Sequence, residues 1–527
     1  MNMTDFYLDI YSLPSIDYQE KCQQGLCFSE DDFKKIVEDL YCFLSIYDDD
    51  QTVGTVIRIS KKILIINIAN FIKMIKIKKD ILSKGLSIRY LDKVSFVERA
   101  GGNGLAGSYI ADFFEENTLP LIKPYKEDLV NPLKDNLKRF ASNLKLFTGS
   151  ALGDRVVVFN GNPWLYDYLE KEGVKYTKVH QSLFFPCKKN DKENTLCSDD
   201  KIIRAIEIFI RNVCSHFSIE DKKEENTLRK IVYSIMSKAE RDFNESLKYL
   251  DKKKLNFKEV YSGTCGNYFT RVIFEVLKRK GIKTNATMHS GAIRHLDYPF
   301  DPRLFIEYEI PDNFYVFNKI DADFLNKKYS NRLKENFFKP MREIETENSC
   351  GRHYIVDAKK IRKVIYVGTC SPGGIQFYGV DDDLRKISYE NTLLEKLVKD
   401  GYEVIFKVHP KGAKYNRELI EKKYPTVSFV YDTPIEDLAS KEDSIFIFKM
   451  IDSTAFNQVL STDSPAIVVS ENQRQLLSIE AADILKNRVS FVDCFYENGL
   501  AKIDVQQLDF SLNKKYISDG VFSKKFQ

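Results

Sequence analysis

The sequence predicts an α/β fold built from two Rossmann-like domains, with a helical insertion in the first. Short apolar runs rich in valine and isoleucine alternate with amphipathic segments of helical periodicity in both halves of the chain. Residues 364–412 show this most clearly, because an apolar run, a glycine-rich turn, a helical pattern and a second apolar run follow one another there. That order predicts the βαβ unit of a parallel sheet.

The first half of the chain is expected to end near residue 318. Its helical patterns predict one helix that begins at Pro163 and another that begins at Tyr268. Gly281 follows the second helix and is placed to end it, since glycine readily adopts the left-handed conformation of a helix C-terminus. A charged helical stretch at about 188–255 is expected to be an inserted hairpin or a lid. The expected strands are residues 94–98, 155–160, 175–180, 258–261, 284–289 and 314–318.

The second half is expected to be a doubly wound domain over residues 361–497. A polar stretch at 319–360 shows no clear strand and is expected to link the two halves. Residues 498–527 form a tail, interpreted as a loose end or as a crossing helix that packs back on the first half. The expected strands of the second half are residues 364–367, 403–408, 427–430, 444–448, 466–469 and 489–491.

The composition is that of a globular protein. The 527 residues are 43% hydrophobic and 30% charged, enough for two large α/β domains. The 80 Lys and Arg against 76 Asp and Glu leave a formal net charge of +4, which does not indicate a nucleic-acid partner. The ten cysteines form no CxxC pairs, so we expect reduced cysteines, with neither a disulfide framework nor a metal site.

The most apolar stretch is expected not to cross a membrane. Residues 63–77 are interrupted by Asn67, Asn70 and Lys73 and are too short for a spanning helix. The acidic N-terminus lacks the order of a signal peptide. These features predict a cytoplasmic protein. Four lysines in and after this stretch are interpreted as a solvated face: Lys73, Lys76, Lys78 and Lys79. The alternative is that they attach the protein to a membrane surface.

Several polar residues follow the strands expected in the second half. Since the carboxyl ends of parallel strands meet at one edge of a sheet, these residues should lie together. Hydroxyls and backbone N–H groups at the start of a helix favour an anion. We therefore predict a phosphate site of an activated nucleotide. The candidates are His409, Lys411, Ser453, Thr454, Ser371, Gly373 and Gly374.

Each of these candidates has a structural alternative. His409 is otherwise a satisfied histidine at the end of a strand. Ser453 and Thr454 are otherwise a helix N-cap shared with Asp452, a role that does not exclude phosphate binding. The glycine turn at 368–374 is otherwise a solvent-exposed turn.

Three short motifs resemble those of a known group of enzymes. His409-Pro410 ends a strand, Ser453-Thr454 follows downstream, and His289 precedes Ser290-Gly291 at the end of the first half's sheet. The region from about 258 to 492 resembles the GT-B glycosyltransferases and glycerophosphotransferases of bacterial surface carbohydrate biosynthesis, which use CMP- or CDP-activated donors. No DDG or EDG triplet of the kind found in some sialyltransferases occurs here.

The resemblance implies a GT-B-like enzyme that transfers a residue from a cytidine-nucleotide donor to a surface-polysaccharide or lipid-linked acceptor. It implies that His409, Lys411, Ser453 and Thr454 contact the donor phosphate. The nucleotide-sugar is then a substrate, and neither a separate cofactor nor a metal is expected. It also implies work in the bacterial cytoplasm, including peripheral association with the inner face of the membrane, and no nucleic-acid partner.

The acceptor is expected on the first half, where a base near the cleft would activate its hydroxyl. His289 is the first candidate for that base, and Asp297 and Glu98 are reserves. Arg294 is a candidate for pairing with an anionic acceptor or a donor carboxylate, with a solvated arginine as the alternative.

A glycine-rich stretch from Gly102 to Gly107 fits the pattern GxGxxG. No second strand ending in Asp or Glu follows about 20 residues on, so NAD binding is the weaker alternative. Gly102 and Gly104 are interpreted as part of an acceptor loop. Two rival functions stay open: a sugar-nucleotide epimerase of GT-B-like fold, and a non-catalytic carbohydrate-binding subunit.

Overall fold

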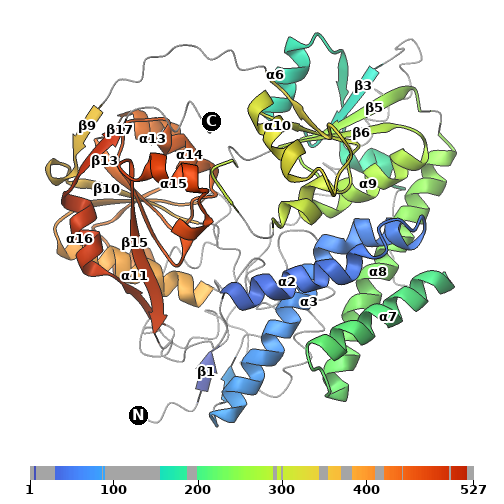
Figure 1. The fold of residues 1–527 in the computed structure, drawn as a ribbon, viewed down its shortest axis with the longest axis horizontal. Helices are drawn as coiled ribbons and strands as arrows, with labels where there is room; N and C mark the ends of the chain where they lie inside the picture. Colours follow the sequence, from blue (N-terminus) through green and yellow to red (C-terminus); the bar gives the residue numbers. More distant parts are fainter. Residues whose placement is uncertain are drawn as a thin grey trace.

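Two parallel sheets organise the chain, each in its own lobe (Figure 1). The computed structural model describes residues 5–7, 30–85, 87–89, 155–186, 199–253, 255–288, 294–297, 301–342, 354–369, 383–409, 420–431, 433–441, 443–497 and 500–518. The expected strand at 94–98 lies outside these residues. The α/β class and the two Rossmann-like units predicted from the sequence are confirmed.

The first sheet has six parallel strands in the order β4-β3-β5-β6-β7-β8. The strand order reverses at β3, so the crevice at its carboxyl edge lies between β3 and β5. Helices α6 (Pro163–Lys171), α9 (Tyr268–Arg279) and α10 (Lys319–Lys328) connect the strands. The strands are β3 (Arg155–Phe159), β4 (Tyr176–Lys178), β5 (Phe257–Ser262), β6 (Lys283–Thr287), β7 (Asn313–Val316) and β8 (Phe338–Pro340).

The local sequence explains these helices. The side chains of Asn162, Asn267 and Asn318 cap α6, α9 and α10 by accepting a backbone hydrogen bond in the first turn. Gly281 follows α9 with φ +70°, as expected for the residue that ends a helix.

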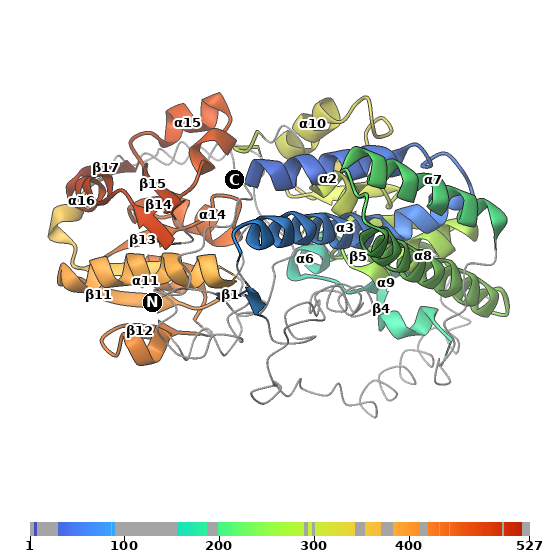
Figure 2. The same cartoon turned by 90° about the horizontal axis from the view of Figure 1, so that it is seen from below.

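Four further helices form a second helical layer (Figure 2). They are α2 (Glu30–Ser45), α3 (Val53–Ser83), α7 (Asp200–His216) and α8 (Lys222–Asp251). In this layer α3 and α8 contact α9, and the other two pack on α3 and α8. Helices α7 and α8 occupy the expected helical insertion. The sequence interpretation missed α2 and α3, because α3 is apolar on most of its faces and so lacks a clear amphipathic stripe.

The apolar stretch 63–77 lies within α3, and its side chains fill the core of the first lobe. Lys73 is 1% exposed, so the interpretation of it as part of a solvated basic face was wrong. Of the helices in the described part of the chain, none has the length and apolarity to cross a membrane.

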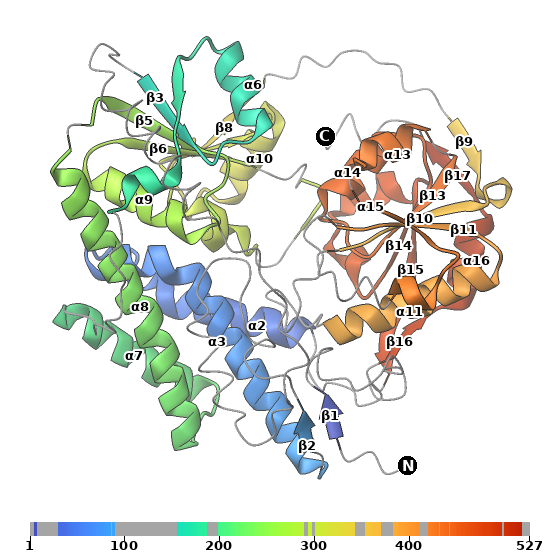
Figure 3. The same ribbon diagram turned by 180° about the vertical axis from the view of Figure 1, so that it is seen from behind.

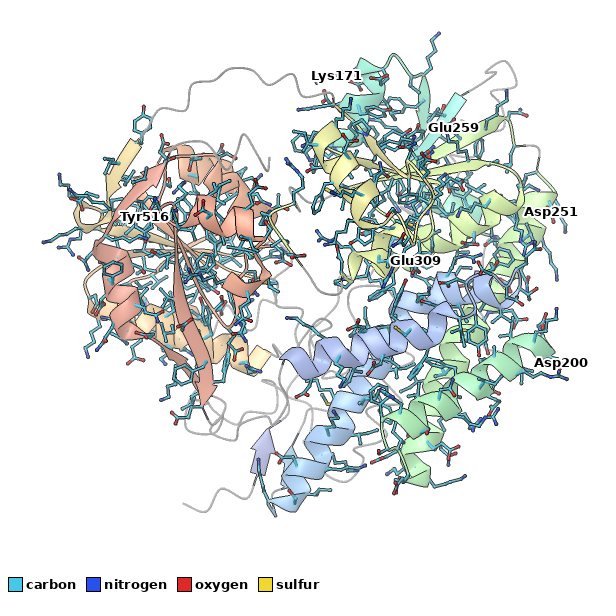
Figure 4. All side chains as sticks on the ribbon, viewed as in Figure 1. Lys171, Asp200, Asp251, Glu259, Glu309 and Tyr516 are labelled. Carbon is cyan, nitrogen blue, oxygen red and sulfur yellow. The ribbon has the colours of Figure 1, made fainter. Side chains whose placement is uncertain are left out.

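Buried charges tie α3 to the rest of the first lobe. Lys61 is fully buried, with Nζ 2.8 Å from Asp48 Oδ1 and 2.8 Å from Glu309 Oε2. Arg58 forms two hydrogen bonds to the Glu275 carboxylate on α9, at 2.9 and 3.0 Å. Figure 4 labels Glu309 where the first lobe meets the layer of α2 and α3.

The second sheet has seven strands in the order β12-β11-β10-β13-β14-β15-β16 (Figure 3). All neighbouring strands are parallel except β15 and β16. The strands are β10 (Lys363–Val367), β11 (Glu403–Lys407), β12 (Ser428–Val430), β13 (Ser444–Phe448), β14 (Ala466–Ser470), β15 (Val489–Glu497) and β16 (Leu500–Ile503). In chain order this is 3-2-1-4-5-6-7, the doubly wound order 3-2-1-4-5-6 with the antiparallel β16 added at its edge, and its switch point lies between β10 and β13.

Helices cover both faces of the second sheet. One core contains residues of α11 (Asp383–Lys399) and α16 (Val505–Asn513). The other contains residues of α13 (Ile435–Lys441), α14 (Thr454–Leu460) and α15 (Ile479–Leu485). Strands buried on both faces read as continuous apolar runs, which is why β13 and β14 stand out in the sequence.

The segments expected to be a linker and a loose tail carry regular structure. Within 319–360, α10 and β8 belong to the first lobe, whereas β9 (Tyr354–Asp357) pairs with β17 (Lys515–Ser518). The described part of the tail, residues 500–518, packs on the second lobe, because Leu508, Leu512 and Tyr516 are buried in the second lobe's core. Strands of three or four residues such as β8 and β9 are too short to show a hydrophobic period. A parallel pair, β1 (Asp5–Tyr7) and β2 (Ser87–Arg89), completes the described strands.

Candidate functional site

The carboxyl edge of the second sheet brings three loops to one level. Val367 at the end of β10 lies opposite Lys407 of β11 and Phe448 of β13. The next residue, Gly368, donates its N–H to the Lys407 carbonyl at 2.9 Å. A Cβ at Gly368 would stand 2.5 Å from the Phe406 ring, so the backbone approaches its neighbour more closely than any other residue allows. The switch point of the sheet, between β10 and β13, lies at this level.

Three basic side chains lie buried at this switch point, and we call them the basic cluster: Arg385, Lys386 and Lys449. The two residues from α11 stand in its first turn, and Lys449 directly follows β13. Lys386 Nζ donates to the carbonyl of Thr369, the residue that follows Gly368. The cluster therefore joins the ends of β10 and β13.

Protein groups hold each cation of the basic cluster in place. Arg385 Nη2 donates to Oε2 of Glu471, the residue that directly follows β14, at 2.9 Å. Lys449 Nζ donates to the Tyr496 hydroxyl at 3.4 Å and lies 5.0 Å from the centre of the Tyr389 ring. Lys386 Nζ is 3.8 Å from Glu390 Oε1. Long basic side chains held in this way have already lost their rotamer freedom before a ligand arrives.

The acids of the site do not cancel its positive charge. Among the described residues, two carboxylates form ion pairs with these three cations, Glu390 and Glu471. Glu390 is buried, and this burial raises the pKa of its carboxyl, although Lys386 and the Tyr366 hydroxyl act in the opposite direction. Tyr366 donates to Glu390 Oε1 at 3.1 Å. The arrangement leaves an excess of positive charge, which suits an anionic ligand.

His409 and Ser453 follow β11 and β13, the two strands that flank β10 at this edge. His409 is half-buried two residues after β11. Ser453 caps α14, and its Oγ accepts the Phe456 N–H at 3.1 Å, so the helix-cap interpretation of Ser453 is confirmed. Thr454 is the exposed first residue of α14. Contact of His409, Ser453 or Thr454 with a phosphate stays a prediction.

The interpretation of Arg294 as a partner for a ligand differs from the structure. Arg294 is 8% exposed, and its Nε forms an ion pair with Asp321 of α10. A buried guanidinium requires such an internal partner. Asp297 is exposed, and its N–H donates to the Leu476 carbonyl of the second lobe at 2.8 Å. Asp297 therefore lies at the contact between the lobes, and its role as a base stays a prediction.

The remaining candidates lie outside the described residues and stay predictions. They are His289, Glu98, Gly102, Gly104, Ser371, Gly373, Gly374 and Lys411. In the part of the chain that the structure describes, no group of three or more His, Cys, Asp and Glu side chains could hold a metal ion.

The carboxyl edge of the first sheet carries amides and an aromatic ring. Asn162 Nδ2 donates to the carbonyls of Gly263 and Met288, at 3.1 and 3.3 Å. Trp164, two residues further, is 46% exposed, and its ring packs edge-on against Phe317 at 5.1 Å. Residues that follow β3, β5, β6 and β7 thus meet in one place, a suitable surface for a polar ligand.

The basic cluster was missed in the sequence, although signals for it were present. Cations in the first turn of a helix oppose the helix dipole, so Arg385 and Lys386 are unlikely choices for helix stability alone. Lys449 directly follows an uninterrupted apolar strand. His295, which contacts the second lobe, has no signal in the sequence because only tertiary packing brings it there.

Comparisons with known proteins show no family for this chain. No protein-family model matches it, and no curated protein matches it. Similar solved structures include UDP-GlcNAc 2-epimerase from Methanocaldococcus jannaschii, with 13% identity, a TM-score of 0.35 and coverage of 68% of this chain and 93% of that chain. Os79 from O. sativa in complex with UDP and deoxynivalenol-3-glucoside shows 11% identity, a TM-score of 0.33 and the same coverage. A putative UDP-N-acetylglucosamine 2-epimerase from Listeria monocytogenes shows 8% identity, a TM-score of 0.31 and coverage of 60% and 79%.

Likeness at TM-scores of this size carries no argument about function. The fold is defined here by strand order and direction: two doubly wound sheets, parallel except for β16, each with a switch point where its strand order reverses. Function must be argued from the residues at those switch points.

Proposed function

We propose that the protein is a transferase that takes a residue from a nucleotide-activated donor and passes it to a saccharide or lipid-linked acceptor. The observation that carries this proposal is the basic cluster, three buried cations at the switch point of the second sheet. Ligands of open α/β sheets bind at such a switch point. In this proposal the nucleotide arrives as part of the substrate, and neither a resident cofactor nor a metal takes part.

The transfer reaction requires positive charge near the bond between the nucleotide and the residue that is transferred. When the bond to the transferred residue breaks, a phosphate oxygen of the nucleotide takes up negative charge. Cations that are already oriented stabilise the transition state, where this charge develops, more than they stabilise the ground state. They therefore lower the barrier of the reaction. Arg385, Lys386 and Lys449 supply this charge, and His409 and Ser453 add donors from the adjacent loops.

The finer proposal is that the donor carries cytidine, as CMP or CDP. Its support is the resemblance of His409-Pro410 and Ser453-Thr454 to the motifs of cytidine-nucleotide transferases. No described contact selects the base, so uridine nucleotides belong in the same experiment. Work at the inner face of a bacterial membrane, with a lipid-linked surface-polysaccharide acceptor, is proposed on the same resemblance alone.

The test is a nucleotide screen by calorimetry and thermal shift, with CMP, CDP, UMP, UDP, GDP and NAD. A nucleotide that binds the folded protein raises its apparent melting temperature. Lys449→Met should weaken the binding of the nucleotide about tenfold to a hundredfold, since a charge-assisted hydrogen bond contributes about 1.5–3 kcal/mol. Lys486→Met is the matched control, because Lys486 is a 60% exposed lysine of the same lobe. The proposal is wrong if none of the six ligands binds.

Measurements of donor turnover with and without an acceptor distinguish a transferase from an epimerase and from a non-catalytic subunit. A transferase releases nucleotide from its donor faster when an acceptor is present. An epimerase converts the sugar-nucleotide without any acceptor, and a non-catalytic subunit binds without turnover.

A further inference from the structure

A short segment of the first lobe crosses to the second lobe. We call residues 294–297 the crossing segment, since the chain lies in the first lobe both before it, at β6, and after it, at β7. Leu296 forms an antiparallel β-bridge with Leu477. The Ser478 N–H donates to the His295 carbonyl at 2.9 Å, and the Asp297 N–H donates to the Leu476 carbonyl at 2.8 Å. The crossing segment thus pairs with the loop that follows β14.

Each lobe anchors one part of the crossing segment. Arg294 is held in the first lobe by its buried ion pair with Asp321, which is 1% exposed. Leu296 is 2% exposed and belongs to the apolar core of the second lobe, with Leu477 and Phe456. Buried contacts of this kind at both ends make the segment a fixed connection between the lobes.

His295 carries this connection to the edge of the proposed donor site. It is fully buried, and its Nε2 lies 3.1 Å from the carbonyl of Ile451. A carbonyl only accepts, so Nε2 carries the hydrogen. Ile451 directly precedes Asp452 and Ser453, and its own N–H donates to Gln473 Oε1 at 3.3 Å. His295 and Gln473 therefore fix the turn from which α14 starts.

The surroundings keep the His295 ring neutral. Burial lowers its pKa to about 4, and the positive charges of Arg303 and Arg294 act in the same direction, whereas the hydrogen bond to Ile451 opposes them. On the second lobe, the ring of Phe456 faces it, with centroids 6.5 Å apart. A neutral imidazole is a donor of fixed direction in this apolar site.

We propose that His295 is a positioning residue that holds the turn 451–453, so that the contact between the lobes and the occupancy of the donor site are coupled. The coupling rests on the proposed function, whereas the positioning of the turn does not. Because such coupling is reciprocal, a ligand that binds at this turn must also strengthen the contact of the crossing segment.

The experiment compares two substitutions of His295, each made in the whole 527-residue chain. His295→Phe keeps a ring of similar volume and removes the N–H, whereas His295→Gln keeps an N–H donor. His295→Leu replaces the Phe variant if that variant does not fold. His216→Ala is the matched control, since His216 is an exposed histidine of α7 paired with Asp39.

Amide hydrogen exchange, measured without any ligand, tests whether His295 positions the turn 451–453. The informative amides belong to Ile451, Phe456, Asp297 and Ser478, because their hydrogen bonds define the turn and the crossing contact. We expect these amides to exchange at least tenfold faster in His295→Phe and to stay near wild type in His295→Gln and His216→Ala. Unchanged exchange at Ile451 and Phe456 in the Phe variant would overturn the positioning role.

Titration with CDP and with UDP tests whether the contact between the lobes is coupled to the occupancy of the donor site. We expect the better of the two to bind about tenfold more weakly to His295→Phe than to wild type, and to slow exchange at Asp297 and Ser478 in wild type. Equal affinity in wild type and His295→Phe, alongside faster exchange, would disprove the coupling and keep the positioning. If wild type binds neither nucleotide, the proposed function and the coupling both fail, and exchange at Ile451 and Phe456 still decides the positioning.

Discussion

The guanidinium of Arg385 lies over the ring of Tyr496, with Cζ 3.8 Å from the ring centre. The Tyr496 hydroxyl also donates to the Arg385 carbonyl and accepts from Lys449 Nζ, each at 3.4 Å. One phenol of β15 thus contacts two cations of the basic cluster, one on α11 and one after β13. Cation–π contacts of this kind hold a guanidinium in place and, unlike the ion pair with Glu471, do not neutralise its charge.

The first prediction separates the ring of Tyr496 from its hydroxyl. Tyr496→Leu removes the cation–π contact and both hydroxyl contacts, so we expect a loss of about 1–2 kcal/mol in the free energy of unfolding and weaker nucleotide binding. Tyr496→Phe keeps the ring and should lose about half as much. Urea denaturation followed by circular dichroism, with calorimetry for binding, measures both. Equal losses in the two variants would show that the ring contact contributes nothing.

The second prediction concerns the buried charge of Lys61. Lys61→Met removes the buried cation between the partly buried carboxylates of Asp48 and Glu309, which should cost about 1.5–3 kcal/mol of stability. The fluorescence of Trp164, the chain's only tryptophan and a residue of the same lobe, reports the unfolding. Lys84→Met, at a 46% exposed lysine, is the control and should change stability by less than about 0.5 kcal/mol. Similar effects of the two substitutions would refute this account of Lys61.

The sequence predicted the described strands of both sheets except β8 and β16, and most of the predicted ones are short apolar runs bounded by turn residues. The expected strand at 444–448 coincides with β13, and the expected helix from Pro163 with α6. It did not predict α3, whose apolar residues face the core on several sides, or the place of the tail, which depends on Leu508, Leu512 and Tyr516 finding the second core. Figure 4 labels Tyr516 in that lobe, where its hydroxyl donates to Ser490 Oγ at 3.0 Å.

The sequence predicted at which edge of the sheet the candidate site lies, but it did not predict the residues of the basic cluster. The rule that parallel strands end at one edge predicted the neighbourhood of His409 and Ser453. The partners of Arg385, Lys386 and Lys449 are contributed by side chains and carbonyls far along the chain, so no local pattern reveals them. Arg294 looked available for a ligand because its partner Asp321 is 27 residues away.

The third prediction tests His409. His409→Ala should keep the melting temperature within about 1 °C of wild type, because the side chain is only half-buried after β11. Its turnover of nucleotide donor should fall about 10²–10³-fold, the usual loss for one oriented donor to a developing oxyanion. His216→Ala serves as the control. Near-normal turnover of the His409 variant would remove His409 from the phosphate site.

The last prediction is a pH dependence that follows from His295. The histidine has its ordinary pKa near 6.5 in the unfolded chain and a pKa of about 4 in the folded protein. Between these values the unfolded state binds more protons, so stability is complete above pH 6.5 and is lost as the pH falls toward 4. The slope from this one group reaches at most about 1.4 kcal/mol per pH unit.

Urea denaturation at steps from pH 7.5 to 4.5 measures this dependence, and the variant isolates it from the carboxylates that titrate in the same range. His295→Gln has no titrating ring, so the difference between its stability and that of wild type should shrink or reverse as the pH falls. The decline should begin near pH 6.5, where the carboxylates still contribute little. A difference that stays constant from pH 7.5 to 4.5 would show that His295 is equally easy to protonate in the folded and unfolded states, and hence that it is not buried against Ile451 in solution.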